Sequence, residues 1–212
     1  MFIIEQEAEL VEYTRDADKM LERIARVCYN SEERMACDCA DGYCQKCRER
    51  RNKFLGGLAG KRHDSVFEHA SATFRLVTDR GITHEMVRHR LASFTQSSTR
   101  YIKYDDGLPV VEPIFVKDGE RELWLKAMEA AEKAYADLLT AGVPAQNARD
   151  VLPTSTATTL FMTANFREWK HVVRLRTAQG AHPKIRELTL KIHEQLLPLC
   201  PAYFKDALEE AK

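Results

Sequence analysis

A short window that combines arginines with hydroxyl side chains is the part of this sequence best suited to chemistry. Arg88-His89-Arg90 is followed after seven residues by Ser98 and then by Arg100, and no acidic residue occurs from Met86 to Tyr104. A guanidinium group that no carboxylate neutralises suits phosphate and other planar anions, because its paired N–H donors match their oxygens. The window therefore predicts an anion-binding site.

A second set of basic residues lies on a predicted helix that Asn165 can cap. Arg167, His171 and Arg174 recur at spacings of four and three residues, which places them on one face of that helix. A face of this kind, taken alone, is most often solvated surface. Glu168 is, however, the only acid from Asn165 to Lys184, and this scarcity favours a second anion-facing wall.

Composition limits the classes of protein that fit. The 212 residues suffice for one sizeable core, so we expect a single domain over residues 1–212. With 32 basic and 32 acidic residues, the chain lacks the net charge of a general polyanion binder. No apolar run approaches the roughly 20 residues that a membrane helix needs, and the first residues do not form a basic segment followed by an apolar one. We therefore expect a cytoplasmic protein.

Hydrophobic periodicity predicts the elements that must position these residues. A helix is predicted from Ile82, with Arg88-His89-Arg90 near its carboxyl end, and a loop is predicted over Ser93 to Thr99. The other predicted elements are strands over 8–14, 66–78 and 154–163, and helices over 16–30, 118–140, from 166 and from 183 to 196. Because strands and helices do not alternate regularly, the pattern favours an α+β fold over a doubly wound sheet.

Four cysteines lie within eleven residues, in a Cys-rich insertion at about 35–50: Cys37, Cys39, Cys44 and Cys47. Four thiolates can hold a tetrahedral Zn²⁺ ion or an iron–sulfur cluster. The loop between Cys39 and Cys44 is shorter than the loops of common zinc modules, so free or redox-active thiols are an equal alternative to a structural metal. Structural disulfides are disfavoured in a cytoplasmic protein.

Taken together, the motifs resemble the flavin-dependent thymidylate synthases, the ThyX family. Arg88-His89-Arg90-x7-Ser98 with Arg100 is similar to the signature of that family. Further similar segments follow in the family's order from about residue 20 to about residue 200: Phe67-Glu68-His69, Gly142 to Pro153, Asn165-x-Arg167, Leu175-Arg176 and Ala181 to Arg186. The resemblance implies one α+β domain in which helices flank a mixed or antiparallel sheet.

The same resemblance implies an activity, the reductive methylation of dUMP to dTMP. In that family FAD and NADPH supply the hydride and methylenetetrahydrofolate supplies the carbon, so the flavin carries the redox chemistry. The resemblance also implies a homotetramer with active sites shared between subunits.

Site residues are carried over from the resemblance position by position. For dUMP it implies Glu85, Arg88, Gln96, Ser97, Ser98, Thr99, Arg100, Arg149 and Arg176. For FAD it implies His69, Ser71, Arg88, His89, Arg90, Gln96, Asn165, Arg167 and His171. Arg176 is the candidate catalytic residue, because a guanidinium at the uracil edge would stabilise negative charge at N3 and O2. The structural alternative for Arg176 is an ion pair with a carboxylate such as Glu187.

Two positions depart from the family pattern, and two other functions stay open. Gln96 stands where Glu is frequent, and His171 stands where Asn is frequent. A related flavin-dependent hydroxymethylase of pyrimidine deoxynucleotides is one alternative, because the motifs do not fix the final step. The remoter alternative is a nucleic-acid-binding protein with a metal-stapled cysteine cluster beside the basic run Arg48 to Lys53, which the neutral net charge disfavours.

Overall fold

A computed structural model describes residues 1–35, 39, 44–115 and 117–209. Contacts group the chain into two compact units. Unit 1 comprises Met1–Glu9 and Arg75–Met162, and unit 2 comprises Leu10–Phe74 and Thr163–Lys212. The single domain expected from the chain length stays a prediction.

A four-stranded sheet forms the backbone of the fold, and three of its strands contribute residues to both units. Its order is β2 (Glu7–Tyr13), β3 (Ser71–Asp79), β6 (Ala157–Asn165) and β4 (Ala92–Gln96). β3 and β6 run antiparallel, since the Ala70 carbonyl accepts from the Phe166 N–H at 2.8 Å and the Thr156 carbonyl accepts from the Arg80 N–H at 3.2 Å. A separate pair, β1 (Phe2–Ile4) and β5 (Pro109–Val111), is parallel. The expected α+β fold, with helices flanking a mixed or antiparallel sheet, is confirmed in its antiparallel form.

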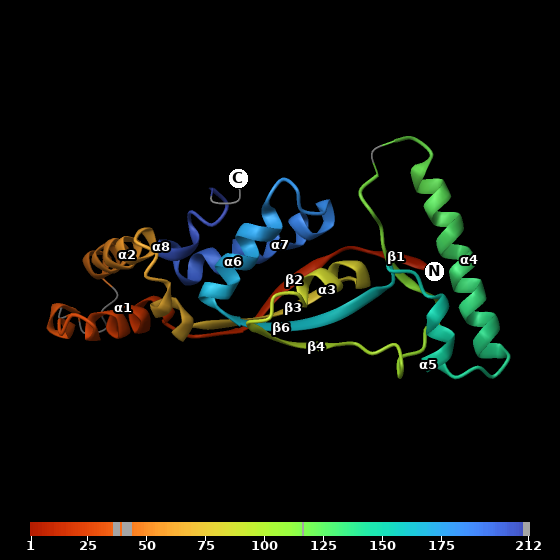
Figure 1. Ribbon diagram of the computed structural model, residues 1–212, viewed down its shortest axis with the longest axis horizontal. Coiled ribbons are helices and arrows are strands. Elements are labelled where there is room, and N and C mark those ends of the chain that lie inside the picture. The colour runs from red at the N-terminus through yellow and green to blue at the C-terminus, as the bar shows by residue number, and fades with distance from the viewer. Residues whose placement is uncertain (36–38, 40–43, 116, 210–212) are drawn as a thin grey trace. The chain divides into compact units, whose positions relative to one another are not determined.

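Alternation of apolar side chains explains the two central strands. Phe74 and Leu76 of β3 are fully buried, as are Leu160 and Met162 of β6, so each strand presents every second residue to a core. In unit 1, α3 (Arg80–Met86) lies alongside these strands (Figure 1).

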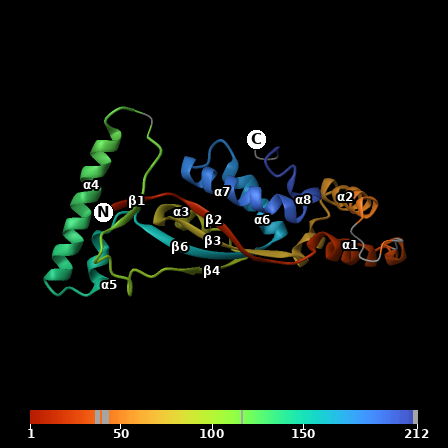
Figure 2. The ribbon, with the colours of Figure 1, turned by 180° about the vertical axis from the view of Figure 1, so that it is seen from behind.

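Unit 1 has a second core beside the parallel strand pair. Leu108, Val110 and Met128 form its buried cluster, with Trp124 packed against them. Met128 and Trp124 belong to the long helix α4 (Glu120–Thr140), beside which α5 (Ala145–Ala148) lies (Figures 1 and 2). The short 3-10 helix η3 (Arg149–Val151) continues α5.

Unit 2 is mostly helical. The helices α1 (Ala17–Val27) and α2 (Gln45–Gly60) pack side by side, and α8 (Pro201–Phe204) packs against α2 (Figures 1 and 2). The other packed pair is α6 (Phe166–Thr177) with α7 (Pro183–Leu196). Short 3-10 helices connect these elements: η1 (Glu32–Met35), η2 (Asp64–His69) and η4 (Leu197–Leu199).

A buried group of charges joins α1 to α2. The Glu22 side chain is 0% exposed and accepts from Arg26 Nη2 at 2.8 Å. Arg51, only 2% exposed, lies with its Nε 3.4 Å from Glu22 Oε2 and donates from Nη1 to Asp18 at 2.7 Å. Because the guanidinium groups of Arg26, Arg50 and Arg51 surround one carboxylate here, each charge depends on the others for the solvation it has lost.

Two expectations about the first basic window are wrong. The predicted helix from Ile82 begins earlier, where Asp79 caps it by accepting from the Ile82 N–H at 2.7 Å, and it ends at Met86. Beyond it the Arg88 and His89 N–H groups bond three residues back, so the helix tightens and stops before the basic triplet. Ser93 to Thr99 is not wholly a loop either, because residues to Gln96 belong to β4.

None of the helices in the described ranges combines the length and hydrophobicity needed to span a bilayer.

Glu22→Gln should lower the free energy of unfolding by about 3 to 5 kcal/mol, because it removes the buried negative charge that faces the guanidinium groups of Arg26 and Arg51. Urea unfolding at neutral pH measures the change. The control is Glu33→Gln, whose side chain is 72% exposed and lies 4.0 Å from Arg34, and which should change that energy by less than about 1 kcal/mol. Equal losses in the two variants would show that burial of the network contributes nothing.

Candidate active site

The end of β6 and the start of β3 form a junction in unit 2 from which α6 begins. Besides the bond between Phe166 and Ala70, the hydroxyls of Thr73 and Thr163 lie 2.9 Å apart across the strands. The indole N–H of Trp169 donates to the Ala72 carbonyl at 2.9 Å. These bonds fix the first turn of α6 against β3.

This junction brings together the five residues of unit 2 that the resemblance assigns to the flavin. His69 and Ser71 flank Ala70, which pairs with the residue after Asn165, while Arg167 and His171 follow one helical turn apart on α6. All five side chains are exposed or half-buried. Residues from two stretches of sequence, 69–71 and 165–171, thus meet at this junction with accessible side chains, and we call them the junction surface.

Two of these residues have defined partners. Asn165 caps α6 as predicted, because its side-chain oxygen accepts from the Glu168 N–H at 2.9 Å. The amide N–H groups of the same side chain can donate to a ligand. Arg167 donates to Glu68, the middle residue of the Phe67-Glu68-His69 segment. This ion pair links the start of α6 to η2 and orients the Arg167 guanidinium.

Glu168 lies on α6 between Arg167 and His171, and it is buried. Burial raises the pKa of its carboxyl, while the charges of His171 and Arg167 act in the opposite direction. Desolvation, which disfavours the charged form, is thus the larger of the two influences on this carboxyl.

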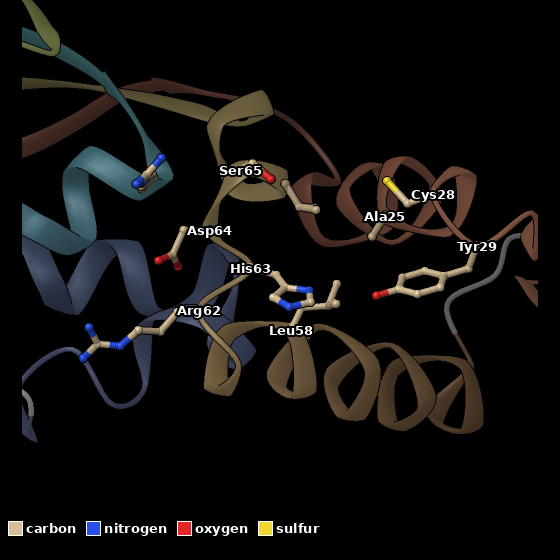
Figure 3. Close-up of a pocket in the computed structure, with 10 residues that line it drawn as sticks. Ala25, Cys28, Tyr29, Leu58, Arg62, His63, Asp64 and Ser65 are labelled. Atoms are coloured by element: carbon tan, nitrogen blue, oxygen red, sulfur yellow. The ribbon is translucent and has the colours of Figure 1, made fainter.

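A cavity of about 370 Å³ adjoins Arg167 in unit 2. Figure 3 shows Ala25 of α1 and Cys28, the residue after α1, on one side and Leu58 of α2 on the other. Polar side chains of the segment between α2 and β3 complete it, among them His63. Its volume lies near the lower end of the roughly 300 to 1,000 Å³ typical of small-molecule pockets. Sequence reasoning missed this pocket, although Arg62-His63-Asp64 directly precedes a segment that it singled out.

The Arg-His-Arg triplet lies in unit 1, between α3 and β4. Arg88 and Arg90 are exposed, whereas His89 is 4% exposed. Within the described residues neither arginine forms an ion pair, so both guanidinium groups can bind an external anion. The sequence window without acids therefore corresponds, in the described residues, to two exposed arginines without an ion-pair partner.

Ser98 and Arg100 form a turn after β4. Ser98 Oγ accepts from the Arg100 N–H at 3.3 Å, and the Ser98 carbonyl accepts from the N–H groups of Tyr101 and Ile102. Since the Ser98 hydroxyl acts as an acceptor in this bond, its own proton can still be donated to a ligand. The geometry suits binding of an anion, and it agrees with the interpretation of Ser98 as a binding residue.

Arg80 holds this turn in place, and sequence reasoning assigned it no role. Arg80 Nη2 donates to the Ser97 carbonyl at 3.0 Å, and Arg80 also hydrogen-bonds Tyr104. Burial raises the pKa of Tyr104, and the Arg80 charge acts against that shift. The sequence feature that could have identified Arg80 is its place directly after Asp79, the N-cap of α3.

The hydrogen bonds of Gln96 account for a glutamine at a position where Glu is frequent in the family. Its Nε2 donates to Thr83 Oγ1 at 3.0 Å and to Thr158 Oγ1 at 3.3 Å. A glutamate could only accept at this position, so both threonine hydroxyls would have to reverse their roles. The amide thus makes bonds to α3 and β6 that a carboxylate would make differently.

The remaining predicted site residues are divided between the units. Unit 1 holds Glu85 on α3, the buried Thr99 and the half-buried Arg149 in η3. Arg176 is half-buried in the last turn of α6 in unit 2. The alternative partner considered for Arg176, Glu187, pairs with Lys191 at 2.9 Å. Of the four cysteines, Cys37 lies outside the described residues, and the other three lie close together in unit 2.

Comparisons with known proteins agree with this assignment of motifs. The profile of the family described as Thymidylate synthase complementing protein, Thy1, matches residues 9–202. The flavin-dependent thymidylate synthase of Geobacter sulfurreducens is 34% identical over 206 residues, which cover 93% of this chain and 85% of that protein. The enzyme of the same name from Mycobacteroides abscessus is 38% identical over 161 residues, or 68% of this chain and 64% of that one.

The fold also has a solved counterpart. The crystal structure of PolB from Streptomyces cacaoi, a UMP/dUMP methylase bound with 5-Br dUMP, superposes with a TM-score of 0.80 over 99% of this chain and 97% of that one, at 23% identity. This likeness establishes the architecture. Since the family profile and the relatives above 30% identity both span most of the chain, the chain belongs to the family of flavin-dependent thymidylate synthases, which are enzymes.

Proposed function

We propose that this chain catalyses the reductive methylation of dUMP to dTMP, with FAD as its flavin, NADPH as reductant and methylenetetrahydrofolate as carbon donor. Family membership supports the class of reaction. One structural observation carries the assignment to this chain, namely that strand pairing and helix pitch gather His69, Ser71, Asn165, Arg167 and His171 into the junction surface. We also propose a cytoplasmic homotetramer with shared sites, because 212 residues leave little room to enclose three ligands.

The residues present fit an FAD. Its pyrophosphate is dianionic and suits the exposed guanidinium groups of Arg88 and Arg90, while the amide of Asn165 and the imidazole of His171 offer donors to a ring system. When bound, the flavin would supply the hydride chemistry that amino-acid side chains lack.

The residues assigned to dUMP bind and polarise it. The Ser98 hydroxyl and the Arg100 guanidinium would bind the nucleotide phosphate from the turn that Arg80 holds. Arg176 would stabilise negative charge at N3 and O2 of the uracil, an electrostatic effect that can contribute roughly 3 kcal/mol. The Ser98 hydroxyl accepts from the Arg100 N–H, which is not a general base, and Ser98 is assigned no nucleophilic role.

An anaerobic single-turnover assay tests the proposed reaction. Purified protein with reduced FAD, dUMP and methylenetetrahydrofolate should form dTMP as the flavin becomes oxidised, with the nucleotide identified by mass. Omission of the folate is the control and should abolish dTMP. A hydroxymethyl nucleotide as the product would replace methylation by the sister chemistry, and failure to bind any flavin would contradict the proposal.

Arg176→Lys tests the assigned electrostatic role. Lysine keeps the charge but loses the planar pair of donors, so kcat should fall by about 100-fold, corresponding to roughly 3 kcal/mol, while flavin content stays unchanged. Arg23→Lys is the control, since Arg23 lies on α1 with its side chain 74% exposed. A variant at position 176 with an unchanged rate would remove Arg176 from this role.

A further inference from the structure

Three cysteine thiols gather at the amino-terminal end of α2, and none of them belongs to the residues assigned to dUMP or FAD. The ligand atoms of Cys39, Cys44 and Cys47 all lie within 4.8 Å of one another, and the Sγ atoms of Cys39 and Cys47 are 3.6 Å apart. In a tetrahedral zinc site with Zn–S bonds of about 2.3 Å, neighbouring sulfurs are about 3.8 Å apart. The sulfurs of Cys39 and Cys47 therefore already lie at about the separation that one ion requires, and that of Cys44 lies within 4.8 Å of both.

Burial and local charge suit thiolate ligands here. Cys47 is fully buried, and Cys39 and Cys44 are half-buried. Cys44 is the N-cap of a 16-residue helix whose first turn holds no acid. The partial positive charge of a helix N-terminus favours negative charge beside it, and thiolates are the form of cysteine that binds metals.

The surrounding structure holds both sides of the cluster. Cys47 lies one helical turn before Arg51, which belongs to the buried charges that join α1 to α2. Arg50 Nη2 donates to the Met35 carbonyl at 3.1 Å, which ties the end of η1 to α2. Met35 is thus bonded to α2, and Cys47 is part of α2.

The chemistry of the donors selects the ion. Soft thiolates favour Zn²⁺ over Mg²⁺ or Ca²⁺, which prefer oxygen. The described cysteines form no disulfide with one another, and pairing any two of these three would leave one thiol over. One ion uses all three.

We propose that Cys39, Cys44 and Cys47 bind one Zn²⁺ ion, which ties Cys39 to the first turn of α2. Each thiol releases its proton to solvent as its Zn–S bond forms. Because such binding energy is folding energy, the ion stabilises this end of unit 2. Cys37 lies outside the described residues, so the fourth ligand is not assigned. The inference is independent of the proposed reaction.

Zinc analysis of the full chain tests this site. Protein expressed with zinc and purified under reductant should retain close to one zinc per chain after dialysis, and cobalt in its place should give thiolate-to-cobalt charge-transfer absorption. Cys44→Ser/Cys47→Ser should lower zinc content at least tenfold, whereas Cys28→Ser, an exposed cysteine that caps α1, should leave it unchanged. Zinc retained by the double variant, or iron with sulfide in the wild type, would overturn the assignment.

Alkylation of the wild-type protein provides a test that needs no variant. With zinc bound, Cys28 should react and the three ligands should be protected, and a chelator should expose them. Cys200 should stay unreactive throughout, because burial raises the pKa of its thiol to about 12. Equal modification of Cys39, Cys44 and Cys47 before and after chelation would contradict the proposal.

Discussion

The pairing of β3 with β6, secured by Trp169, is the constraint on which the junction surface depends. The indole hydrogen bond to the Ala72 carbonyl is buried, and the Trp169 ring also packs edge-on against Phe74, with centroids 5.0 Å apart. Leaving such a buried carbonyl without a donor costs roughly 1–3 kcal/mol. Because α6 starts directly from this pairing, the positions of Asn165, Arg167 and His171 beside the start of β3 follow from it.

Charge is distributed in two contrasting ways in a chain without net charge. Around Glu22, guanidinium groups and a carboxylate are buried together, so the arginines there serve packing of α1 on α2. In the window from Met86 to Tyr104 acids are absent, and Arg88 and Arg90 stay exposed. An arginine paired with buried carboxylates is held by the fold, whereas an exposed arginine without such partners can bind a ligand.

Periodicity predicted the elements whose pattern is strong, and tertiary contacts decided the rest. The Asn165 cap and the helix after it were predicted because residue type and spacing agree. β4 was predicted as a loop, since its Ser and Thr residues show no apolar alternation and pairing with β6 is a long-range effect. The sequence did not predict α2, because its glycines and arginines interrupt the apolar pattern of its buried face. The burial of Arg51 in this helix depends on Asp18, an acid 33 residues away in the sequence. The roles of the junction residues came from family resemblance, while their proximity came from strand pairing.

The most direct test of this account is the affinity for FAD of two matched tryptophan variants, measured by flavin fluorescence well below their melting temperatures. Trp169→Phe removes the hydrogen bond that holds α6 to β3 in unit 2, and Trp124→Phe removes an indole bond to Ser155 Oγ in unit 1. The account predicts a several-fold weaker affinity for the first variant and an unchanged affinity for the second. Wild-type affinity in Trp169→Phe would contradict the claim that this junction builds the flavin site.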